Sequence, residues 1–472
     1  MNPGSKRQED VGLHISLIFD ETSPETEWLE DIAASFDYLF VEVDTDSRSS
    51  SITGDFPKLL SLISEKTVSS ITIAGAIPDK ESLRTRCLQI WEADPRVRIY
   101  ITDSCKTDAN TRQIGFSDLV GSDLPDVDQN IIRNEICGKH ILVTGACGSF
   151  GQKLMHRLTE LGAAHITAVD HDETELYLLE QQLQSGAGNV SFYLADITDK
   201  PRMEALFQNQ KFDLIIHTAA YKHVPVMERH PLEAVRVNVL GSRNIAELAD
   251  RFGSNCMITL STDKAVNPAN AMGLTKNLVE RLMKAMDSQS PTQYTSVRIG
   301  NLLGARGSVL PVFDAQIKDG GPVTVTHPEV ERYFIPIPDA VDHTLSVLKY
   351  KQGGDTYLID MGKPVKIDEL ARLLILMHGN QPEIEVPVVY SGLRNGEKMS
   401  EQLISSKEEH YNLPGTPLIR INSGKTSVTE IQSICDQFEV LVARQNHEGL
   451  KDLFAELRRD LSGLEKYEKV NL

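Results

Sequence analysis

The sequence predicts an α/β protein with a Rossmann-type parallel sheet that carries helices on both faces. Short apolar segments alternate with helical patterns along most of the chain. A glycine-rich turn at residues 144–151 follows one apolar segment and opens a helix. Another apolar segment, residues 256–260, ends in the polar cluster at 261–264. In open α/β sheets ligands bind at the carboxyl ends of the strands, so this cluster is the first candidate for a functional site.

The composition is that of an ordinary globular protein. The 472 residues are 40% hydrophobic and 24% charged, and this length favours two or three domains. A formal net charge of −19 argues against nucleic acid as a partner. We find no signal peptide and no apolar segment long enough to cross a bilayer, so we expect a cytoplasmic protein without a membrane span. The six cysteines lack metal-type spacing, which indicates reduced thiols and no metal site.

Residues 1–125 are expected to form a separate, small α/β domain with a parallel sheet. Its apolar segments lie at 14–19, 38–43, 70–74 and 97–101, and its helical patterns at 27–35 and 80–91. The loop at 20–24, after the first segment, has no glycine that would let the backbone approach a phosphate. A role in scaffolding or oligomerisation is therefore favoured over nucleotide binding.

The glycine-rich turn is the predicted cofactor site. Gly145, Gly148 and Gly151 would allow a tight turn, and the helix that follows would direct free N–H groups and its positive end toward a pyrophosphate. The next strand ends at Asp170, whose carboxylate would bind an adenosine ribose and repel a 2′-phosphate, which favours NAD over NADP. Asp170 alone would be an ordinary turn residue, but its position after the glycine turn favours the cofactor.

Two more strand ends complete the predicted cofactor site. One is followed by Asp196 and Ile197, and the other, at 214–217, is followed by small residues that would let a dinucleotide lie close. Asn238, on a later helix, could equally be a hydrogen bonder in the packing. The residues assigned to the cofactor from these patterns are Thr144, Gly145, Gly148, Ser149, Phe150, Gly151, Asp170, Asp196, Ile197, Ala219, Ala220 and Tyr221.

The NAD-binding part is expected to span 137–300 and a smaller, lid-like substrate-binding part 301–425, which together make a catalytic domain of residues 126–425. Short strands are predicted at 322–327, 332–336 and 356–360. The cationic loop at 394–398 suits a diphosphate, although a solvated surface loop is an equally good interpretation. The tail at 426–472 is helical by pattern and is expected to pack on the body of the protein or on a partner.

Residues 114–403 resemble the UDP-N-acetylglucosamine 4,6-dehydratases of polysaccharide biosynthesis, a branch of the extended short-chain dehydrogenase/reductases. The matching motifs occur in one order, at 144–151, 219–228, 261–276, 297–309, 321–328, 332–334, 360–365 and 396–398. The resemblance implies a form of the larger members that lacks their membrane-anchoring helices. It also implies that the N-terminal domain is a degenerate Rossmann-like domain.

The resemblance further implies NAD-dependent dehydration of a UDP-N-acetylhexosamine, most simply UDP-N-acetylglucosamine. Carbon 4 would be oxidised, water eliminated across carbons 5 and 6, and hydride returned to carbon 6, while NAD stays bound. Thr262 would bind the 4-hydroxyl, Asp263 would act as acid and Lys264 as base, and Lys276 would bind the nicotinamide ribose. Alternatively, Lys264 only pairs with Asp263 and orients it. The residues assigned to the UDP-sugar are Lys222, His223, Asn301, Arg306, Thr326, His327, Arg332, Arg394 and Glu397.

Met272 departs from the pattern of most short-chain dehydrogenases, which have a tyrosine at this place as the base for the oxidised hydroxyl. A thioether cannot accept that proton, although the larger family members share the methionine. Asp263, Lys276 and Tyr221 are the candidates for the carbon 4 base. Cys147, which stands where glycine is usual, is a second departure, and Phe150, where isoleucine is common, is a minor one.

Two other functions remain open on the sequence. A 4- or 5-epimerase would share the oxidation step, because fold does not determine the outcome of the reaction. A catalytically silent protein that binds NAD or a nucleotide sugar would explain Met272 and Cys147. The resemblance also implies a homodimer or higher homo-oligomer that pairs through helices beside the active-site strand.

Overall fold

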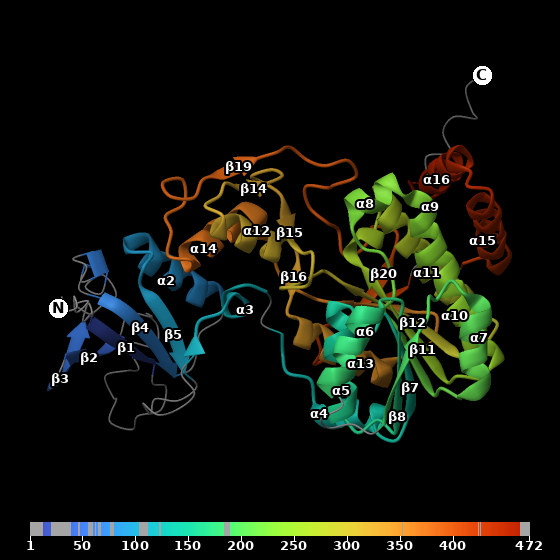
Figure 1. The fold of residues 1–472 in the computed structure, drawn as a ribbon, viewed down its shortest axis with the longest axis horizontal. Helices are drawn as coiled ribbons and strands as arrows, with labels where there is room; N and C mark the ends of the chain where they lie inside the picture. Colours follow the sequence, from blue (N-terminus) through green and yellow to red (C-terminus); the bar gives the residue numbers. More distant parts are fainter. Residues whose placement is uncertain are drawn as a thin grey trace, which may run out of the picture. The chain divides into compact units, whose positions relative to one another are not determined.

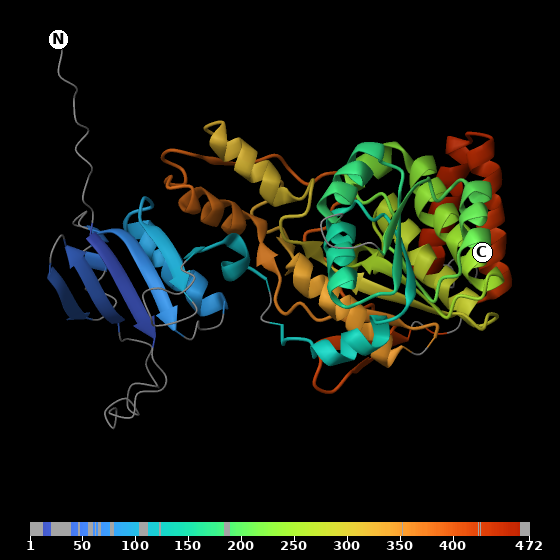
Figure 2. The same cartoon turned by 60° about the horizontal axis from the view of Figure 1, so that its bottom comes forward.

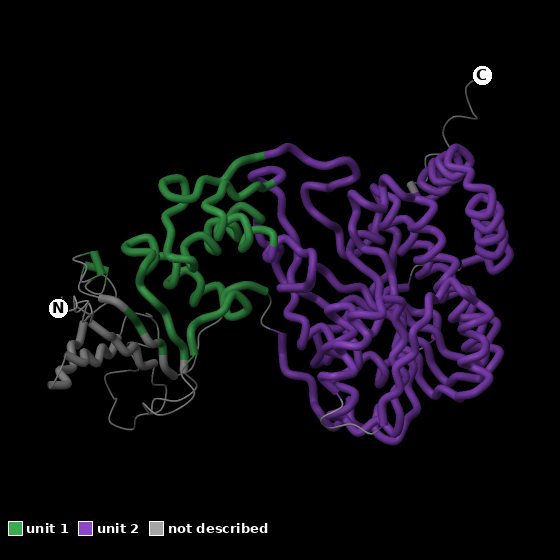
Figure 3. Tube along the Cα trace, viewed as in Figure 1, with its two compact units in different colours: residues 1–123, 312–325, 367–390 green, residues 124–311, 326–366, 391–472 purple. Residues whose placement is uncertain are grey.

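In a computed structural model the chain forms two compact units (Figure 3). Unit 1 comprises residues 1–123, 312–325 and 367–390, and unit 2 comprises residues 124–311, 326–366 and 391–472. The structure describes residues 13–19, 39–45, 48–54, 60–61, 63–64, 68–75, 80–102, 112–121, 124–183, 189–351, 353–422, 424 and 426–462. The loop at 20–24 and the helix predicted at 27–35 lie outside these residues. The domain boundaries after residues 125 and 425 stay predictions.

Unit 1 contains a mixed six-stranded sheet in the order β3-β2-β1-β4-β5-β6. The strands are β1 (Leu13–Phe19), β2 (Leu39–Thr45), β3 (Arg48–Gly54), β4 (Val68–Gly75), β5 (Arg98–Thr102) and β6 (Arg112–Gln113). The prediction of a parallel sheet was wrong for half of it, because only β1, β4 and β5 are parallel. β2 pairs antiparallel with both β1 and β3, and only two residues separate β2 from β3, a distance that permits an antiparallel pair alone.

The helices of unit 1 come from both ends of its sequence. They are α2 (Lys80–Ala93), α3 (Phe116–Leu119), most of α12 (Val309–Lys318) and α14 (Ile367–Met377). α2 buries Leu83, Cys87, Ile90 and Trp91. The parallel pair β14 (Val323–Val325) and β19 (Val388–Tyr390) completes the unit. Two segments of the predicted substrate-binding part thus lie in the same compact unit as the N-terminal sheet.

Unit 2 is built on a nine-stranded sheet in the order β20-β21-β17-β12-β11-β10-β7-β8-β9 (Figures 1 and 2). Its parallel strands are β7 (His140–Thr144), β8 (His165–Asp170), β9 (Val190–Leu194), β10 (Leu214–His217), β11 (Cys256–Thr262), β12 (Gln293–Ile299) and β17 (Thr356–Ile359). β20 (Glu409–Asn412) and β21 (Leu418–Asn422) extend one edge in antiparallel pairing. The strand order reverses between β7 and β10, which is the ligand-binding position in doubly wound folds and confirms the predicted fold class.

Helices cover both faces of this sheet (Figure 1). One hydrophobic core includes residues of α4 (Gln129–Ile136), α5 (Ser149–Glu160), α6 (Glu173–Leu183) and α13 (Ile337–Tyr350). The other includes residues of α7 (Lys200–Asn209), α9 (Pro231–Ala234), the π-helical segment Val235–Gly241, α10 (Ser242–Arg251), α11 (Ala271–Asp287), α15 (Val428–Ala443) and α16 (His447–Ser462). The C-terminal helices therefore pack on the body of unit 2, one of the two arrangements expected for the tail.

Part of the region after residue 300 belongs to the main sheet and not to a separate lid. The segment predicted as a lid strand at 356–360 is β17, which belongs to the main sheet because it pairs with β12. Smaller pairs form between β13 (Asn301–Leu302) and β16 (Phe334–Ile335), and between β15 (Glu331–Arg332) and β18 (Val365–Lys366). Over the described part of the chain, no helix has the length and apolar character needed to span a bilayer.

Candidate active site

Three consecutive side chains at the end of β11 are joined by hydrogen bonds. The strand is buried through Ile258 and continues to Thr262, after which a single 3₁₀ turn, Asp263–Ala265, leads away. The Thr262 hydroxyl donates to Asp263 Oδ1 at 2.8 Å, and Lys264 Nζ donates to the same oxygen at 2.9 Å. Thr262 Oγ1 also accepts a hydrogen bond from the Lys264 amide at 3.4 Å. The structure therefore brings together the three residues predicted for the reaction.

The second carboxylate oxygen of Asp263 is buried without a partner among the described residues. Asp263 is fully buried, and its Oδ2 has no hydrogen-bond partner among the described residues. A buried carboxylate oxygen without a partner loses its hydration without compensation, which is unfavourable. A hydroxyl or proton donor on a bound molecule would satisfy it.

Lys264 connects this cluster to the predicted substrate-binding part of the chain. Its Nζ donates to Asn301 Oδ1 at 3.3 Å, and Asn301 Nδ2 donates to the carbonyl of Tyr333 at 3.0 Å. Burial, followed by the negative charges of Glu331 and Asp263, raises the pKa of the Tyr333 phenol. The Lys264–Asp263 ion pair is the contact expected if Lys264 only orients Asp263. The same contact also places the predicted base next to the predicted acid.

Helix α11 carries Lys276 beneath this cluster. Asn270 caps the helix by accepting from the Gly273 amide at 2.7 Å, and Glu228 accepts from the Ala271 amide at 2.5 Å. A Cβ on Gly273 would lie 2.3 Å from the Lys264 carbonyl, so the helix packs directly on the turn Asp263–Ala265. Burial lowers the pKa of Lys276 to about 8, against the opposing effect of Glu280. No hydrogen-bond partner of the Lys276 amine occurs among the residues that the structure describes.

Met272 is buried in a small apolar cluster with Met227 and Ala234, against which Tyr221 and Val224 pack. Its side chain therefore fills space and offers no proton acceptor. Tyr221, one candidate for the carbon 4 base, lies beside it. Among the three candidates for the carbon 4 base, Asp263 is favoured because it already accepts a hydrogen bond from Thr262, the residue predicted to bind the 4-hydroxyl.

The glycine turn has the shape that a dinucleotide requires. Gly145 has a φ of +70°, and a Cβ on it would lie 2.6 Å from the Ala219 amide nitrogen. A Cβ on Gly151 would lie 2.2 Å from the Gly145 carbonyl, so neither position has room for a side chain. The turn ends at Ser149, the first residue of α5, where the free N–H groups of the helix begin. These features and the partnerless Lys276 amine fit NAD.

Asp170 holds the turn together. Its Oδ2 accepts from the Cys147 amide at 2.9 Å and its Oδ1 accepts from the His171 amide at 2.8 Å. Burial and the Asp170 charge raise the pKa of the Cys147 thiol, which is therefore neutral. Oδ1 also accepts from the Asp172 amide at 3.2 Å and lies 3.2 Å from His171 Nδ1. Because a carboxylate has about four acceptor sites, two on each oxygen, the remaining capacity for a ribose hydroxyl is on Oδ2. Both interpretations of Asp170, as turn residue and as ribose ligand, are compatible with this geometry.

The other predicted cofactor residues lie at the adjacent strand ends. Asp196 accepts from the Thr198 amide at 2.8 Å and pairs with Arg236 at 3.3 Å, while Ile197 is buried. Asn238 accepts from the Tyr221 amide at 2.8 Å and donates to its carbonyl at 3.0 Å. Asn238 therefore forms hydrogen bonds inside the packed protein, one of the roles left open by the sequence. These bonds hold the segment that contains Ala219 and Ala220.

A fully buried histidine lies beneath the turn. His217 Nδ1 is 2.7 Å from Thr144 Oγ1, and Nε2 is 2.9 Å from Ser242 Oγ. Burial, followed by the positive charge of Lys276, lowers the pKa of His217 to about 3, so the ring is neutral. Its position in the apolar strand 214–217 predicted burial but not this hydrogen-bonded chain.

Arg306, which is predicted to bind substrate, contacts the glycine turn, and Lys222 and His223 contact the loop that carries Arg306. The backbone amide of Arg306 donates to Ser149 Oγ at 3.0 Å, and its guanidinium donates to the Cys147 carbonyl. Lys222 Nζ donates to the Arg306 carbonyl at 3.0 Å, and the His223 ring lies against Gly307. Burial lowers the pKa of Lys222 and of His223, and the neighbouring cations Arg306 and Lys222 respectively add to the effect.

Three more of the predicted substrate residues, Thr326, Arg332 and Arg394, contact Glu397. Its Oε1 accepts from Thr326 Oγ1 at 3.1 Å and pairs with Arg332 at 3.2 Å, and its Oε2 accepts from the Arg394 amide at 3.1 Å. His327 lies next to Thr326, and its Nδ1 accepts from the Glu329 amide at 3.1 Å. The loop at 394–398 is therefore tied to buried Arg332 rather than being only a solvated surface loop.

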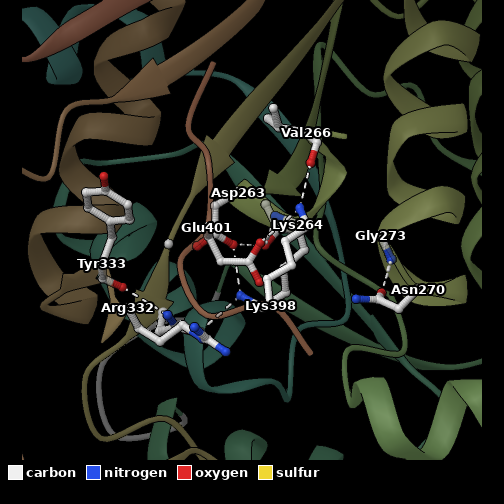
Figure 4. Close-up of polar contacts among 12 residues, drawn as sticks. Asp263, Lys264, Val266, Asn270, Gly273, Arg332, Tyr333, Lys398 and Glu401 are labelled. Atoms are coloured by element: carbon white, nitrogen blue, oxygen red, sulfur yellow. Dashed lines mark hydrogen bonds and ion pairs between the residues drawn. The ribbon is translucent and has the colours of Figure 1, made fainter. Parts of the chain in front are cut away.

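Sequence reasoning named Lys398 only as part of the cationic loop 394–398 and missed Glu401; the two residues contact the segment that follows the turn Asp263–Ala265 (Figure 4). Lys398 Nζ donates to the Val266 carbonyl at 2.9 Å and pairs with Glu401 at 3.2 Å. Glu401 is buried. The i, i+3 spacing of a lysine and a glutamate was visible in the sequence, but their contact with Val266 spans more than one hundred residues and left no local pattern.

Known proteins resemble this chain mainly over unit 2. The polysaccharide biosynthesis protein family matches residues 141–422. The capsular polysaccharide biosynthesis protein CapD of Staphylococcus aureus is 41% identical over 305 residues, which cover 64% of this chain and 51% of CapD. A UDP-glucose 4-epimerase of Rickettsia akari is 33% identical over 279 residues, covering 57% of this chain and 79% of that protein. The matched region thus spans about half the length of CapD.

Solved structures show the same fold. The dTDP-glucose 4,6-dehydratase DesIV of Streptomyces venezuelae, with NAD and TYD bound, aligns with a TM-score of 0.51 at 20% identity. The alignment covers 56% of this chain and 88% of DesIV. Because the family match extends over more than half of the sequence, the chain belongs to the polysaccharide biosynthesis protein family, and its unit 2 has the short-chain dehydrogenase/reductase fold that nucleotide-sugar dehydratases and epimerases share.

Proposed function

We propose that the protein dehydrates a UDP-N-acetylhexosamine, with UDP-N-acetylglucosamine as the first substrate to test, to the UDP-4-keto-6-deoxy sugar. The observation that carries the proposal is the buried Asp263 carboxylate, which shares one oxygen with Thr262 and Lys264 and has no partner among the described residues for the other. Elimination across carbons 5 and 6 requires a base at one carbon and an acid at the hydroxyl of its neighbour, and these side chains supply both.

NAD fits the cradle formed by the glycine turn, Asp170, Asp196, Ile197, the segment 219–221 and Lys276. When bound, it would supply a hydride acceptor for carbon 4 and return the hydride to carbon 6. The turn would hold the pyrophosphate through backbone N–H groups, and the Asp170 carboxylate would discriminate against a 2′-phosphate. Lys276, with a pKa of about 8, would bind ribose hydroxyls in its cationic form near neutral pH.

Among side chains, Thr262, Asp263 and Lys264 are enough to carry the proton transfers. The 4-hydroxyl proton would pass through Thr262 to Asp263, which leaves the carboxyl neutral and able to act as an acid. Protonation of Asp263 removes the negative charge that stabilises the Lys264 ammonium, which favours release of an ammonium proton to solvent and leaves the neutral amine as base for the carbon 5 proton. Asp263 then protonates the departing 6-hydroxyl to give water, Lys264 returns the proton to carbon 5, and the amine regains a proton from solvent. This cycle needs no tyrosine at position 272.

The buried cluster around Glu397 and the cations Lys222 and Arg306 are proposed to bind the UDP-sugar. Arg332 and Glu397 fix each other, so their contacts with Thr326 and the 394 loop are preorganised. Lys222 and Arg306 differ in their partners, because Arg306 forms hydrogen bonds with the glycine turn. Arg394 contributes its backbone to Glu397, which leaves the guanidinium available for a diphosphate.

A 4-epimerase is the second candidate, supported by the similarity to the Rickettsia akari epimerase. The two functions differ in their products. Purified protein incubated with UDP-N-acetylglucosamine is expected to give a new methyl signal and a 4-keto product by ¹H NMR. Conversion to the galacto isomer with the 6-hydroxyl intact would instead establish the epimerase.

A further inference from the structure

The loop at residues 304–308, between β13 and α12, contacts the chain after three neighbouring strands. After β7, the Arg306 amide donates to Ser149 Oγ at 3.0 Å and its Nη2 donates to the Cys147 carbonyl. After β8, its Nη1 pairs with Glu175 on α6 at 2.5 Å. After β10, the Arg306 carbonyl accepts from Lys222 Nζ at 3.0 Å.

The close packing of this loop is supported by Gly307. Its φ is +69°, and a Cβ built on it would lie 2.6 Å from Cε1 of His223. Both the conformation and the contact exclude a side chain, so the loop lies directly against the segment that follows β10.

These contacts lie along the edge where the cofactor is proposed to bind. β8, β7 and β10 are adjacent in the sheet, and their carboxyl ends carry Asp170, the glycine turn and the segment 219–221. An extended dinucleotide at this edge would pass the same three strand ends that the loop contacts. Leaving the site would therefore require contacts of the loop to break.

We propose that residues 304–308 form a strap that retains NAD through successive turnovers, with the Arg306–Glu175 ion pair as its fastening. The inference rests on the proposed function, because a dehydratase that returns its hydride must keep the same cofactor bound. The Arg306 side chain is 53% exposed and Glu175 29%, so the pair alone stabilises little and acts together with the Ser149, Cys147 and Lys222 contacts. In this role Arg306 serves the cofactor in addition to its proposed contact with the UDP-sugar.

The proposal is tested with Arg306→Ala and Glu175→Gln, each measured against wild type. Glu173→Gln is the matched control, because Glu173 is an exposed carboxylate on the same helix turn. The measurements are the NAD content per chain after gel filtration and the rate at which bound NAD exchanges with isotopically labelled NAD. We expect exchange to accelerate about tenfold in Arg306→Ala, less in Glu175→Gln, and not at all in the control. The double variant should be no faster than Arg306→Ala.

Exchange at the wild-type rate in Arg306→Ala, with only the KM for the UDP-sugar raised, would overturn the strap and assign Arg306 to the substrate. If NAD exchange accelerated as much in Glu173→Gln as in Glu175→Gln, the assigned role of the Arg306–Glu175 ion pair would be wrong. The dehydratase activity is judged separately, by formation of the 4-keto product. Slow exchange of bound NAD without any product would support the strap and contradict the proposed function. A wild-type protein that binds no NAD would overturn both.

Discussion

The Thr262 hydroxyl and the Lys264 ammonium donate to the same oxygen of Asp263, at 2.8 Å and 2.9 Å. A proton that reaches Asp263 through Thr262 therefore changes the electrostatic environment of Lys264 directly. The base and the acid of the elimination are coupled through one atom. This coupling explains how an active site with Met272 in place of a tyrosine can move the 4-hydroxyl proton.

Replacing Thr262 by valine removes the hydroxyl and keeps the shape of the side chain. We expect kcat to fall by about 100-fold or more, because the relay from the 4-hydroxyl to Asp263 is lost. Thr262→Ser keeps the hydroxyl and should retain most of the activity. Steady-state rates of 4-keto product formation check this, and near-equal rates for the valine and serine variants would remove Thr262 from the proton path.

Lys264 is tested by two substitutions that separate its possible roles. Lys264→Arg keeps a cation beside Asp263 but cannot act as a base, since arginine is not deprotonated in proteins. We expect both Lys264→Arg and Lys264→Ala to abolish elimination while NAD remains bound. Absorbance of the bound reduced cofactor at about 340 nm should still appear with substrate, because oxidation precedes elimination. Substantial turnover by the arginine variant would support the orienting role instead.

Substituting tyrosine for Met272 tests the carbon 4 base. If Asp263 already accepts the proton, Met272→Tyr should give no gain in kcat and should destabilise the fold by about 1–3 kcal/mol through overpacking of the cluster with Met227 and Ala234. Met272→Leu conserves volume and is the control for packing. A large increase in kcat in the tyrosine variant would mean that the native site lacks an efficient base.

Lys276 predicts a pH dependence of stability. Burial lowers its pKa to about 8 from the ordinary lysine value of 10.5, so between these values the unfolded chain holds a proton that the folded chain has released. The free energy of unfolding should therefore rise with pH in this window, by up to about 1.4 kcal/mol per unit from this group. Urea unfolding of NAD-free wild type and Lys276→Met at pH 8 and 9.5 measures it. Parallel changes in the two proteins would contradict the buried amine.

The sequence predicted the parts of the fold that depend on local patterns. The apolar strands, the glycine turn and the polar end of β11 are short-range signals, and the cluster of Thr262, Asp263 and Lys264 follows from their being consecutive residues at a strand end. The antiparallel strands of unit 1 were missed because alternation of strand and helix does not encode direction. β17 was placed in the lid because its pairing with β12 depends on residues about sixty positions apart.

The same distinction applies to the site. The chemistry of Arg306 indicated an anion ligand, but its bonds to Ser149 and Cys147 join residues more than 150 positions apart, and no local pattern reports them. The contacts of Lys398 and Glu401 were missed for the same reason. Resemblance supplied residue roles, and only the fold shows which of these residues lie together.

The most direct test follows ¹H NMR of UDP-N-acetylglucosamine with purified protein in deuterated buffer, without added NAD. We predict loss of the carbon 6 hydroxymethyl signals and the appearance of a 6-deoxy methyl group and a 4-keto sugar, with deuterium at carbon 5 from the proton returned by Lys264. Unchanged substrate and unchanged UDP-N-acetylgalactosamine in the presence of bound NAD, or isomerisation that keeps the 6-hydroxyl, would contradict the proposed dehydratase.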